Sequence, residues 1–307
     1  MKHFTGVHIT PNALRAALIR EDFKFVKEGS WDMGPEQHTQ DGLVAIIAEA
    51  VRTVDPGGSA TANGVTLPGT LHRWEGRIDA CPDVPAWVGL RLKEALEQKI
   101  GGHVMMDKES NCVTAGEVLR GQAGFHSDLI AVHMGRHIDG AIILHRHLWH
   151  GGTGMAGSVG HMVVDRDGPE AGDGTALRGT LNAYISDSAI AGRLKSRPVE
   201  GVDPASADLL IRLASATGPE AQEHLDAIGA AIATPVAGLI NALDVRSILL
   251  SGIGQETYDK LAESVARGLA SRVAPPLRDG ITLVPATTGD NAALIGAGYN
   301  WLLQPHD

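Results

Sequence analysis

The chain has 307 residues, of which 43% are hydrophobic and 20% are charged, and its formal net charge is -10 at pH 7. This length supports one large or two medium globular domains. An acidic chain repels a phosphate backbone, so we expect no nucleic-acid partner.

The cysteine count and the N-terminal residues point to the cytoplasm. Cys81 and Cys112 are the two cysteines and form no CxxC motif, which excludes a disulfide framework and favours a reducing compartment. The opening MKHFTGVHIT has no signal-peptide pattern, and no window approaches the length of a transmembrane helix. We therefore expect a cytoplasmic protein with no membrane partner.

The first part of the chain reads as an antiparallel strand meander followed by alternating helices and strands. Apolar residues at helical spacing follow the third strand, and Asp55-Pro56-Gly57-Gly58 ends that helix. The predicted strands cover 4–9, 13–19, 23–31, 62–69 and 103–106, and the predicted helices cover 42–54, 85–99 and 111–120.

A second block opens near Asp128 and repeats this layout. DLIAVHMG, HIDGAIIL and HLWHGG read as strands, and VHMGRHIDGAIIL echoes the earlier VHITPNALRAALI. A repeated strand-rich opening suggests two related α/β halves. The remaining predicted elements are helices over 205–216, 219–243, 258–270 and 292–303, and strands over 247–250 and 281–284.

Six stretches, in order along the chain, resemble elements of the ROK family of repressors, open reading frames and sugar kinases. They are GVTLPGTLHRWEGRI, PDVPAW, GMAGSVGHMVVDRDG, LNAYIS, SILLSGIG and TGDNAALIGAG. The resemblance implies two actin-like, ribonuclease-H-like α/β domains with a cleft that holds sugar and nucleotide. We expect a small domain over 1–121, completed by a C-terminal helix over 290–307, a larger domain over 122–289, and a homodimer.

The resemblance also implies which residues face a sugar. Two of these positions carry glutamate in the family and carry Ser158 and Asn182 here, so ordinary glucose recognition is in question and a modified sugar, amino sugar or phosphosugar is expected. Plain packing is the alternative role for each position. The implied substrate-binding residues are Gly69, Asp83, Lys108, Glu109, Ser158, His161 and Asn182.

The first nucleotide turn differs from the family pattern Asp-x-Gly-Gly-Thr-Lys. The corresponding residues are His8, Thr10, Pro11, Asn12 and Ala13. Proline has no amide hydrogen, and both the glycine pair and the lysine are missing, so we expect poor phosphate binding here.

The second nucleotide turn keeps part of its glycine pattern. Gly135, Arg136 and Gly140, together with Gly252 further along the chain, are the candidate nucleotide-binding residues. Arg136 suits a phosphate, whereas Asp139 would repel one. The alternative is an ordinary hairpin turn with charged residues at its tip.

The catalytic Asn-Asp pair of the family corresponds to Lys108 and Glu109. Glu109 is therefore the candidate general base, although it is one methylene longer than aspartate, and a displacement of about 1 Å can cost roughly 100-fold in rate. The alternative is that Asp107, Glu109 and Ser110 cap the following helix. Lys108 would suit an anionic ligand.

The structural zinc of the family needs a histidine and three cysteines. His161 is present, but the cysteine positions read Asp173, Thr175 and Thr180. Threonine is not a usual zinc ligand, so we expect no structural zinc. His145 and His147 are predicted to share one strand face, so a chelating pair is possible; the alternative is a polar strand face beside a cleft.

Two hypotheses remain for the function. The first is a carbohydrate-binding protein derived from a sugar kinase, with ATP-dependent hexokinase activity weak or lost. The second is a divergent ATP-dependent hexose or amino-sugar kinase that uses Mg-ATP and Glu109. A third, sugar hydrolysis by two of Asp83, Glu109 and Asp173, stays open. A repressor is not expected, because the first predicted strand begins near residue 4.

Overall fold

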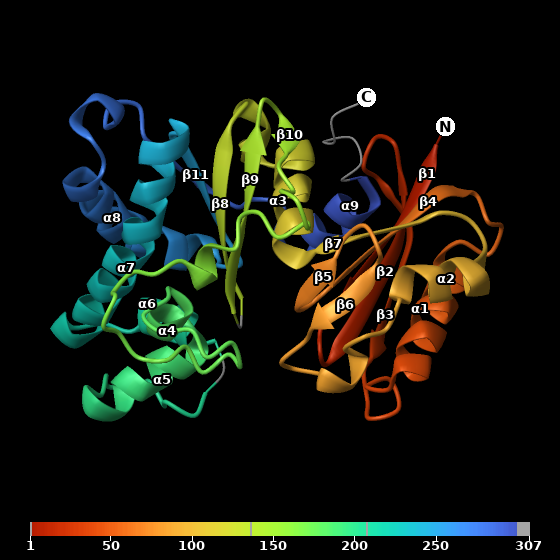
Figure 1. Ribbon diagram of the computed structural model, residues 1–307, viewed down its shortest axis with the longest axis horizontal. Coiled ribbons are helices and arrows are strands. Elements are labelled where there is room, and N and C mark those ends of the chain that lie inside the picture. The colour runs from red at the N-terminus through yellow and green to blue at the C-terminus, as the bar shows by residue number, and fades with distance from the viewer. Residues whose placement is uncertain (1, 136, 207, 300–307) are drawn as a thin grey trace. The chain divides into compact units, whose positions relative to one another are not determined.

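The computed structural model describes residues 2–135, 137–206 and 208–299, and the chain forms two compact units (Figure 1). The first comprises Met1–Phe125, Leu144–Ala156 and Thr287–Asp307, and the second His126–Ile143 and Gly157–Ala286. The sequence pattern placed 144–156 in the larger domain, but contacts group it with the first unit, where His150 bonds to Asp107. The domain boundaries stay a prediction.

The first unit is built on a five-stranded sheet with the order β3-β2-β1-β4-β7. β2 is antiparallel to β1 and β3, whereas β4 is parallel to β1 and β7. Its elements are β1 (His3–Ile9), β2 (Ala13–Arg20), β3 (Phe25–Asp32), α1 (Gln40–Val54), β4 (Ala60–Leu67), β5 (Thr70–His72), β6 (Arg77–Ala80), η1 (Pro85–Trp87), α2 (Leu92–Ile100), β7 (Val104–Lys108), α3 (Glu109–Arg120), η2 (Gln122–Phe125), β10 (His147–Leu148), η5 (Gly289–Asn291) and α9 (Ala292–Tyr299).

Helices cover both faces of this sheet. The apolar faces of α1 and α2 pack with side chains such as Val7 and Val65 in one core. α9 packs on the other face, where Leu294 and Tyr299 meet Phe4, and α3 packs against α9. The alternation along β1, with Phe4 on one face and Val7 on the other, follows from the two-residue repeat of a strand.

Glycines allow α9 to approach the sheet and α3 closely. A Cβ at Gly6 or Gly64 would lie 2.0 or 1.8 Å from a backbone oxygen of α9. Gly116 of α3 and Gly296 of α9 are restricted in the same way, at 2.1 and 1.7 Å from a backbone oxygen of the other helix. Any larger side chain at these positions would push the backbones apart.

The second unit is built on the same pattern. Its elements are β8 (Leu129–Met134), β9 (Ile138–Leu144), η3 (Val159–His161), α4 (Asn182–Ile185), α5 (Asp187–Ser196), α6 (Leu209–Ser215), α7 (Pro219–Leu243), β11 (Ser247–Ser251), α8 (Gln255–Arg272), η4 (Pro275–Leu277) and β12 (Thr282–Pro285). The strands of this unit lie in the order β9-β8-β11-β12, with β9 antiparallel to β8, β11 parallel to β8 and β12 parallel to β11. This order and these directions repeat those of β2-β1-β4-β7 in the first sheet, as expected for two related halves.

Several predicted elements need correction. The helix expected over 85–99 is interrupted, because Gly89 has φ +86 and separates η1 from α2. α6 begins only at Leu209, after Asp208 with φ +55. His145 does not share a strand face with His147, since His145 and Arg146 form a turn with positive φ. Neither the β5–β6 hairpin nor α5 was expected from the sequence.

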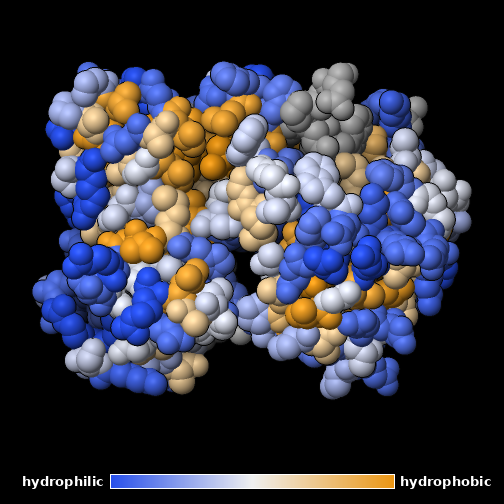
Figure 2. Space-filling view, in the orientation of Figure 1, coloured by the Kyte–Doolittle hydropathy of each residue, from blue (hydrophilic) through white to orange (hydrophobic). Residues whose placement is uncertain are grey.

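α7 contradicts the expectation that no window approaches the length of a transmembrane helix. It has 25 residues, which makes it long and apolar enough by composition to span a bilayer, yet half of its most apolar window is buried within the structure. It packs against α8, and burial of this kind is typical of a core helix. The face drawn in Figure 2 is mainly hydrophilic, with apolar patches among the polar side chains.

Candidate functional site

A buried carboxylate lies where β7 meets α3. Asp107 is 2% exposed and pairs with the guanidinium of Arg73. His150 Nε2 lies 2.9 Å from Asp107 Oδ2, and Asn111 Nδ2 donates to Oδ1 at 2.7 Å. The backbone N–H of Lys108 donates to Oδ1 as well, at 2.9 Å. Both carboxylate oxygens are therefore held in place.

These partners keep Asp107 ionised. Burial by itself would raise the pKa of Asp107, but the hydrogen bond from His150 and the charge of Arg73 outweigh burial, and the pKa lies below its ordinary value. Asp107 is not the N-cap residue of α3. Lys108 holds that position, and its side chain makes no capping hydrogen bond.

Glu109 is the first residue of α3 and pairs with His8 of β1. Glu109 Oε1 lies 2.7 Å from His8 Nε2, and the two side chains are 30% and 16% exposed. His8 is paired with Thr66 of β4, the strand that lies between β1 and β7, so the sheet fixes both ends of this contact. The result is a carboxylate–imidazole pair that is held on one side and open to solvent on the other, an arrangement suited to proton transfer or to binding hydroxyl groups.

The other predicted sugar-facing residues of the first unit occupy different settings. Lys108 is buried, at 3% exposure. Gly69 has φ +100 in the turn after β4, and a Cβ there would lie 2.1 Å from Ala80 O. Asp83 is half-buried in the segment that follows β6. Their roles in ligand binding stay predictions.

The turn between β1 and β2 uses its own amide donors. Thr10 N–H donates to Ala13 O at 2.8 Å, and Ala13 N–H donates to Thr10 Oγ1 at 3.1 Å. Pro11 has no amide hydrogen. Its carbonyl oxygen lies 2.9 Å from His38 Nε2, which ties the turn to the segment before α1. Thr10, Pro11 and Ala13 therefore offer no spare amide to a phosphate.

The second predicted nucleotide turn connects β8 and β9. Gly135 is exposed in this turn, whereas Gly140 is buried in β9, where an added Cβ would lie 2.2 Å from Ala131 O. Gly252 has φ +80, and a Cβ there would lie 2.4 Å from Met134 O, so packing alone requires glycine at this position. Arg136 lies outside the described residues.

Two of the predicted sugar-facing residues of the second unit, His161 and Asn182, form a polar cluster with Asp173. His161 Nε2 lies 3.6 Å from Asp173 Oδ2, and Asn182 Nδ2 donates to the same oxygen at 3.3 Å. Thr175 donates to Asp173 Oδ1 from both its N–H and its hydroxyl. Ser158 precedes η3, which carries His161. Burial acts to raise the pKa of Asp173, but the Thr175 hydrogen bonds and His161 hold it below its ordinary value.

This cluster does not fit a structural zinc ion. The donor set at the expected positions is His161, Asp173 and two threonine hydroxyls, and zinc sites use cysteine, histidine and carboxylate ligands. Thr175 Oγ1 already donates to Asp173, and Thr180 Oγ1 is buried without a hydrogen-bond partner among the described residues. Direct hydrogen bonds hold this loop instead.

The sequence profile of the ROK family matches residues 4–304. This chain belongs to the ROK family. A glucokinase from Thermotoga maritima is 26% identical to this ROK protein over 95% of each chain. A xylose repressor from Bacillus spizizenii is 26% identical over 76% of this chain and 59% of the repressor's length.

A solved structure supports the fold of this ROK protein. A ROK glucokinase from Streptomyces griseus, solved with glucose and AMPPNP, superposes with a TM-score of 0.78 at 24% identity, covering 96% of this chain and 98% of that one. The predicted fold class, two actin-like α/β domains, is confirmed.

Sequence reasoning singled out Glu109, His161, Asp173 and Asn182 as candidates but missed the partners of Glu109 and Asp107. His8 was considered only as the residue that replaces the aspartate of the family's first nucleotide turn, and Arg73 and His150 were not connected with Asp107. Trp74 was also missed, although it is 59% exposed beside Arg73, whose guanidinium carbon lies 5.4 Å from the ring centroid. An exposed tryptophan in the stretch TLHRWEGR was the one available signal.

Proposed function

We propose that this ROK protein binds a sugar or sugar derivative through Glu109 and its neighbours, and that ATP-dependent phosphoryl transfer is weak or absent. The observation that carries the proposal is the turn between β1 and β2. The N–H groups of Thr10 and Ala13 are bonded within the turn and Pro11 has none, so the turn makes a poor cradle for a triphosphate.

The polar groups that remain suit hydroxyl recognition. Glu109 has a fixed orientation through His8 and keeps 30% of its side chain exposed, so its carboxylate is accessible to a sugar hydroxyl. Trp74 adds an exposed apolar ring in the same unit. The two relatives, a glucokinase and a xylose repressor, both carry sugar names, which supports a sugar ligand.

A thermal-shift panel tests this proposal. Hexoses, pentoses, amino sugars and sugar phosphates are each compared with Mg-ATP. We expect at least one sugar alone to raise the Tm and Mg-ATP to leave it unchanged. A large rise with Mg-ATP, together with sugar-dependent release of ADP, would contradict the loss of kinase activity.

Glu109→Gln identifies the residue responsible. A hydrogen bond to a charged group contributes about 1.5–3 kcal/mol, so we expect the sugar affinity to fall by about 10-fold or more. Glu49→Gln, on the exposed side of α1, is the matched control and should keep the wild-type affinity. Equal affinities for all three proteins would remove Glu109 from the site.

The second candidate function is a divergent sugar kinase, and the His8–Glu109 contact favours it. An imidazole 2.7 Å from the carboxylate could orient Glu109 as a general base and take on part of the proton's charge. In that case Mg-ATP would act as the phosphoryl donor, and Glu109→Gln would abolish ADP release while leaving sugar binding largely intact.

Homodimer formation, a cytoplasmic location and the absence of nucleic-acid binding belong to the proposal too. The net charge of -10 supports the last of these. Light scattering tests for the dimer, and a fluorescence-anisotropy titration with duplex DNA at low salt tests for nucleic-acid binding. Saturable binding of DNA would favour a repressor-like role.

A further inference from the structure

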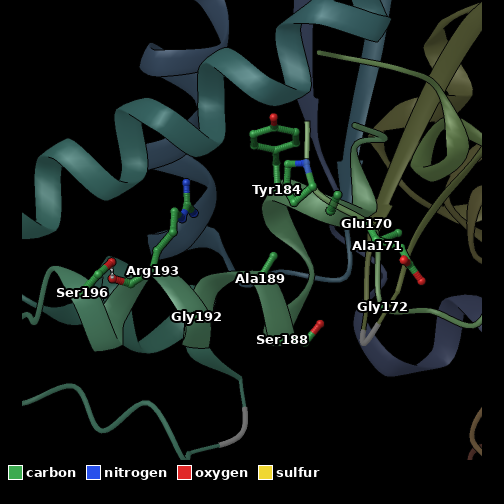
Figure 3. Close-up of a pocket in the computed structure, with 11 residues that line it drawn as sticks. Glu170, Ala171, Gly172, Tyr184, Ser188, Ala189, Gly192, Arg193 and Ser196 are labelled. Carbon is green, nitrogen blue, oxygen red and sulfur yellow. Dashed lines mark hydrogen bonds between the residues drawn. The ribbon is translucent and has the colours of Figure 1, made fainter. Parts of the chain in front are cut away.

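A pocket of about 410 Å³ lies in the second unit, between residues 169–172 and the helices α4 and α5 (Figure 3). Tyr184, Ser188, Gly192, Arg193 and Ser196 line its helical side. The volume matches a small metabolite. No residue of the His161–Asp173–Asn182 cluster lines it, so it is separate from the proposed sugar-facing residues of this unit.

Arg193 lines this pocket, and no ion pair compensates its charge within residues 2–135, 137–206 and 208–299. Its Nε and Nη2 atoms are buried and make no hydrogen bond within the part of the chain that the structure describes. Figure 3 shows its side chain extending from α5 and the carboxylate of Glu170 pointing away from it. Burial lowers the pKa of Arg193, with no opposing contribution from an acidic neighbour.

A buried guanidinium without a partner is costly. Nearly all buried polar groups in folded proteins are hydrogen-bonded, and a buried charge is normally paired. The planar fork of arginine matches the two oxygens of a carboxylate or phosphate. An oxyanion that reached the guanidinium from the pocket would give it the acceptor that it lacks.

We propose that this pocket is a binding site for a small metabolite that bears an oxyanion, with Arg193 as the group that recognises the charge. A phosphate or carboxylate group lies against the guanidinium, and the rest of the ligand occupies the space beside Gly192. This site is independent of sugar binding by Glu109.

Three further features fit this occupant. Ser186 Oγ accepts the N–H of Ala189 and lies 3.0 Å from Ser188 Oγ, so when Ser186 donates its proton to Ser188, the Ser188 hydroxyl is left to donate to a ligand. A Cβ at Gly192 would meet no atom within 4 Å, which shows open space at the wall. The hydroxyl of Tyr184 donates to Asp165 at 2.9 Å, so the aromatic ring is the part of Tyr184 that contributes to the pocket lining.

The test measures binding of inorganic phosphate and of acetate by calorimetry and by thermal shift, against chloride at equal ionic strength. We expect one or both oxyanions to raise the Tm of the wild type by about 3 °C or more near saturation. Whichever anion binds more tightly shows whether the ligand carries a phosphate or a carboxylate group. No shift with either anion would overturn the proposal.

Arg193→Met tests the residue. We expect at least 10-fold weaker anion binding and an unchanged or higher Tm without anion, because the variant removes an unpaired buried charge. Lys195→Met, an exposed position on the same helix with the same change in charge, is the matched control and should keep the wild-type response. A lower Tm for Arg193→Met with the anion response intact would show a purely structural role.

Gly192→Leu provides an independent variant that keeps the arginine. The added side chain fills the open space, so we expect the anion response to be lost while the circular dichroism spectrum is preserved.

A carboxylate of a second copy could pair with Arg193 instead. In that case Arg193→Met would shift the oligomeric state in light scattering and phosphate would not bind, which would contradict a metabolite site.

Discussion

At the residue scale, the contacts of Asp107 hold the end of β7 and the start of α3 in one arrangement. Arg73 and His150, which are distant in the sequence, contact Oδ2, and Asn111, four residues away, donates to Oδ1. Glu109 is two residues further on, so this buried network also sets the position of the candidate binding residue. Asp107 therefore supports the site without being exposed to a ligand.

Asp107→Asn should strongly destabilise the protein at neutral pH. The substitution leaves Arg73 buried without its counter-charge, and breaking a buried ion pair costs about 3–5 kcal/mol. Urea unfolding of the wild type and the variant measures the difference. Asp22→Asn, on an exposed carboxylate that pairs with Arg20, is the control and should change the unfolding midpoint far less.

The pH dependence of that difference has a definite sign. The pKa of Asp107 is lowered in the folded state, so its stabilising contribution is complete above the unfolded-state pKa of about 3.9. It is lost as the pH falls through the lower folded-state value. The gap between wild type and variant should therefore narrow below about pH 4. A gap that stays constant down to pH 2 would contradict the assignment.

Sequence patterns identify Glu109 but not its environment, and the reason is physical. Glu109 follows a strand and begins a helix, which a linear pattern can reveal. Its partner His8 lies 101 residues away and is brought near by the pairing of β1, β4 and β7. Strand order in a sheet is not encoded in local periodicity, so a contact of this kind needs the folded structure.

At the element scale, the packing of α9 depends on glycine. Gly296→Ala should destabilise the first unit, because the new methyl group would lie 1.7 Å from Cys112 O, and overpacking typically costs about 1–3 kcal/mol. Gly238→Ala in α7 is the matched control. Its Cβ meets nothing within 4 Å, so it should stabilise by about 0.5–1 kcal/mol through helix propensity. Opposite signs in thermal melts are the expected result.

The β1–β2 turn makes a further prediction. Pro11→Gly restores an amide hydrogen, but the N–H groups of Thr10 and Ala13 remain bonded inside the turn. We therefore expect Pro11→Gly to bind Mg-ATP no better than the wild type in calorimetry. Nucleotide binding that appears in this single variant would mean that proline alone blocks the loop.

Element boundaries were predicted well where one helix or strand follows a clear pattern. β1, β2 and α7 match their expected ranges closely. The helix predicted over 85–99 failed because apolar spacing continues through Gly89, where a positive φ breaks the helix. The hairpin β5–β6 was missed because its strands have three and four residues, too few for a periodic signal.

At the scale of the whole molecule, the chain is expected to fold without metal. Among residues 2–135, 137–206 and 208–299, no group of three or more histidine, cysteine or acidic side chains is placed to hold a metal ion. We expect EDTA to leave the Tm unchanged and elemental analysis to find no stoichiometric zinc. One zinc ion per chain, with a Tm that falls on chelation, would contradict this.

The two ends of the described chain meet in one unit, and this affects its synthesis. α9 packs against β1 and β4, which precede it by more than 220 residues, so their sheet is covered on both faces only after α9 has been made. The second unit has all of its residues, up to Ala286, available earlier. A nascent chain paused before α9 would present the glycine-lined face of its first sheet to solvent. Chaperone binding to this exposed face would then affect how much of the protein folds correctly.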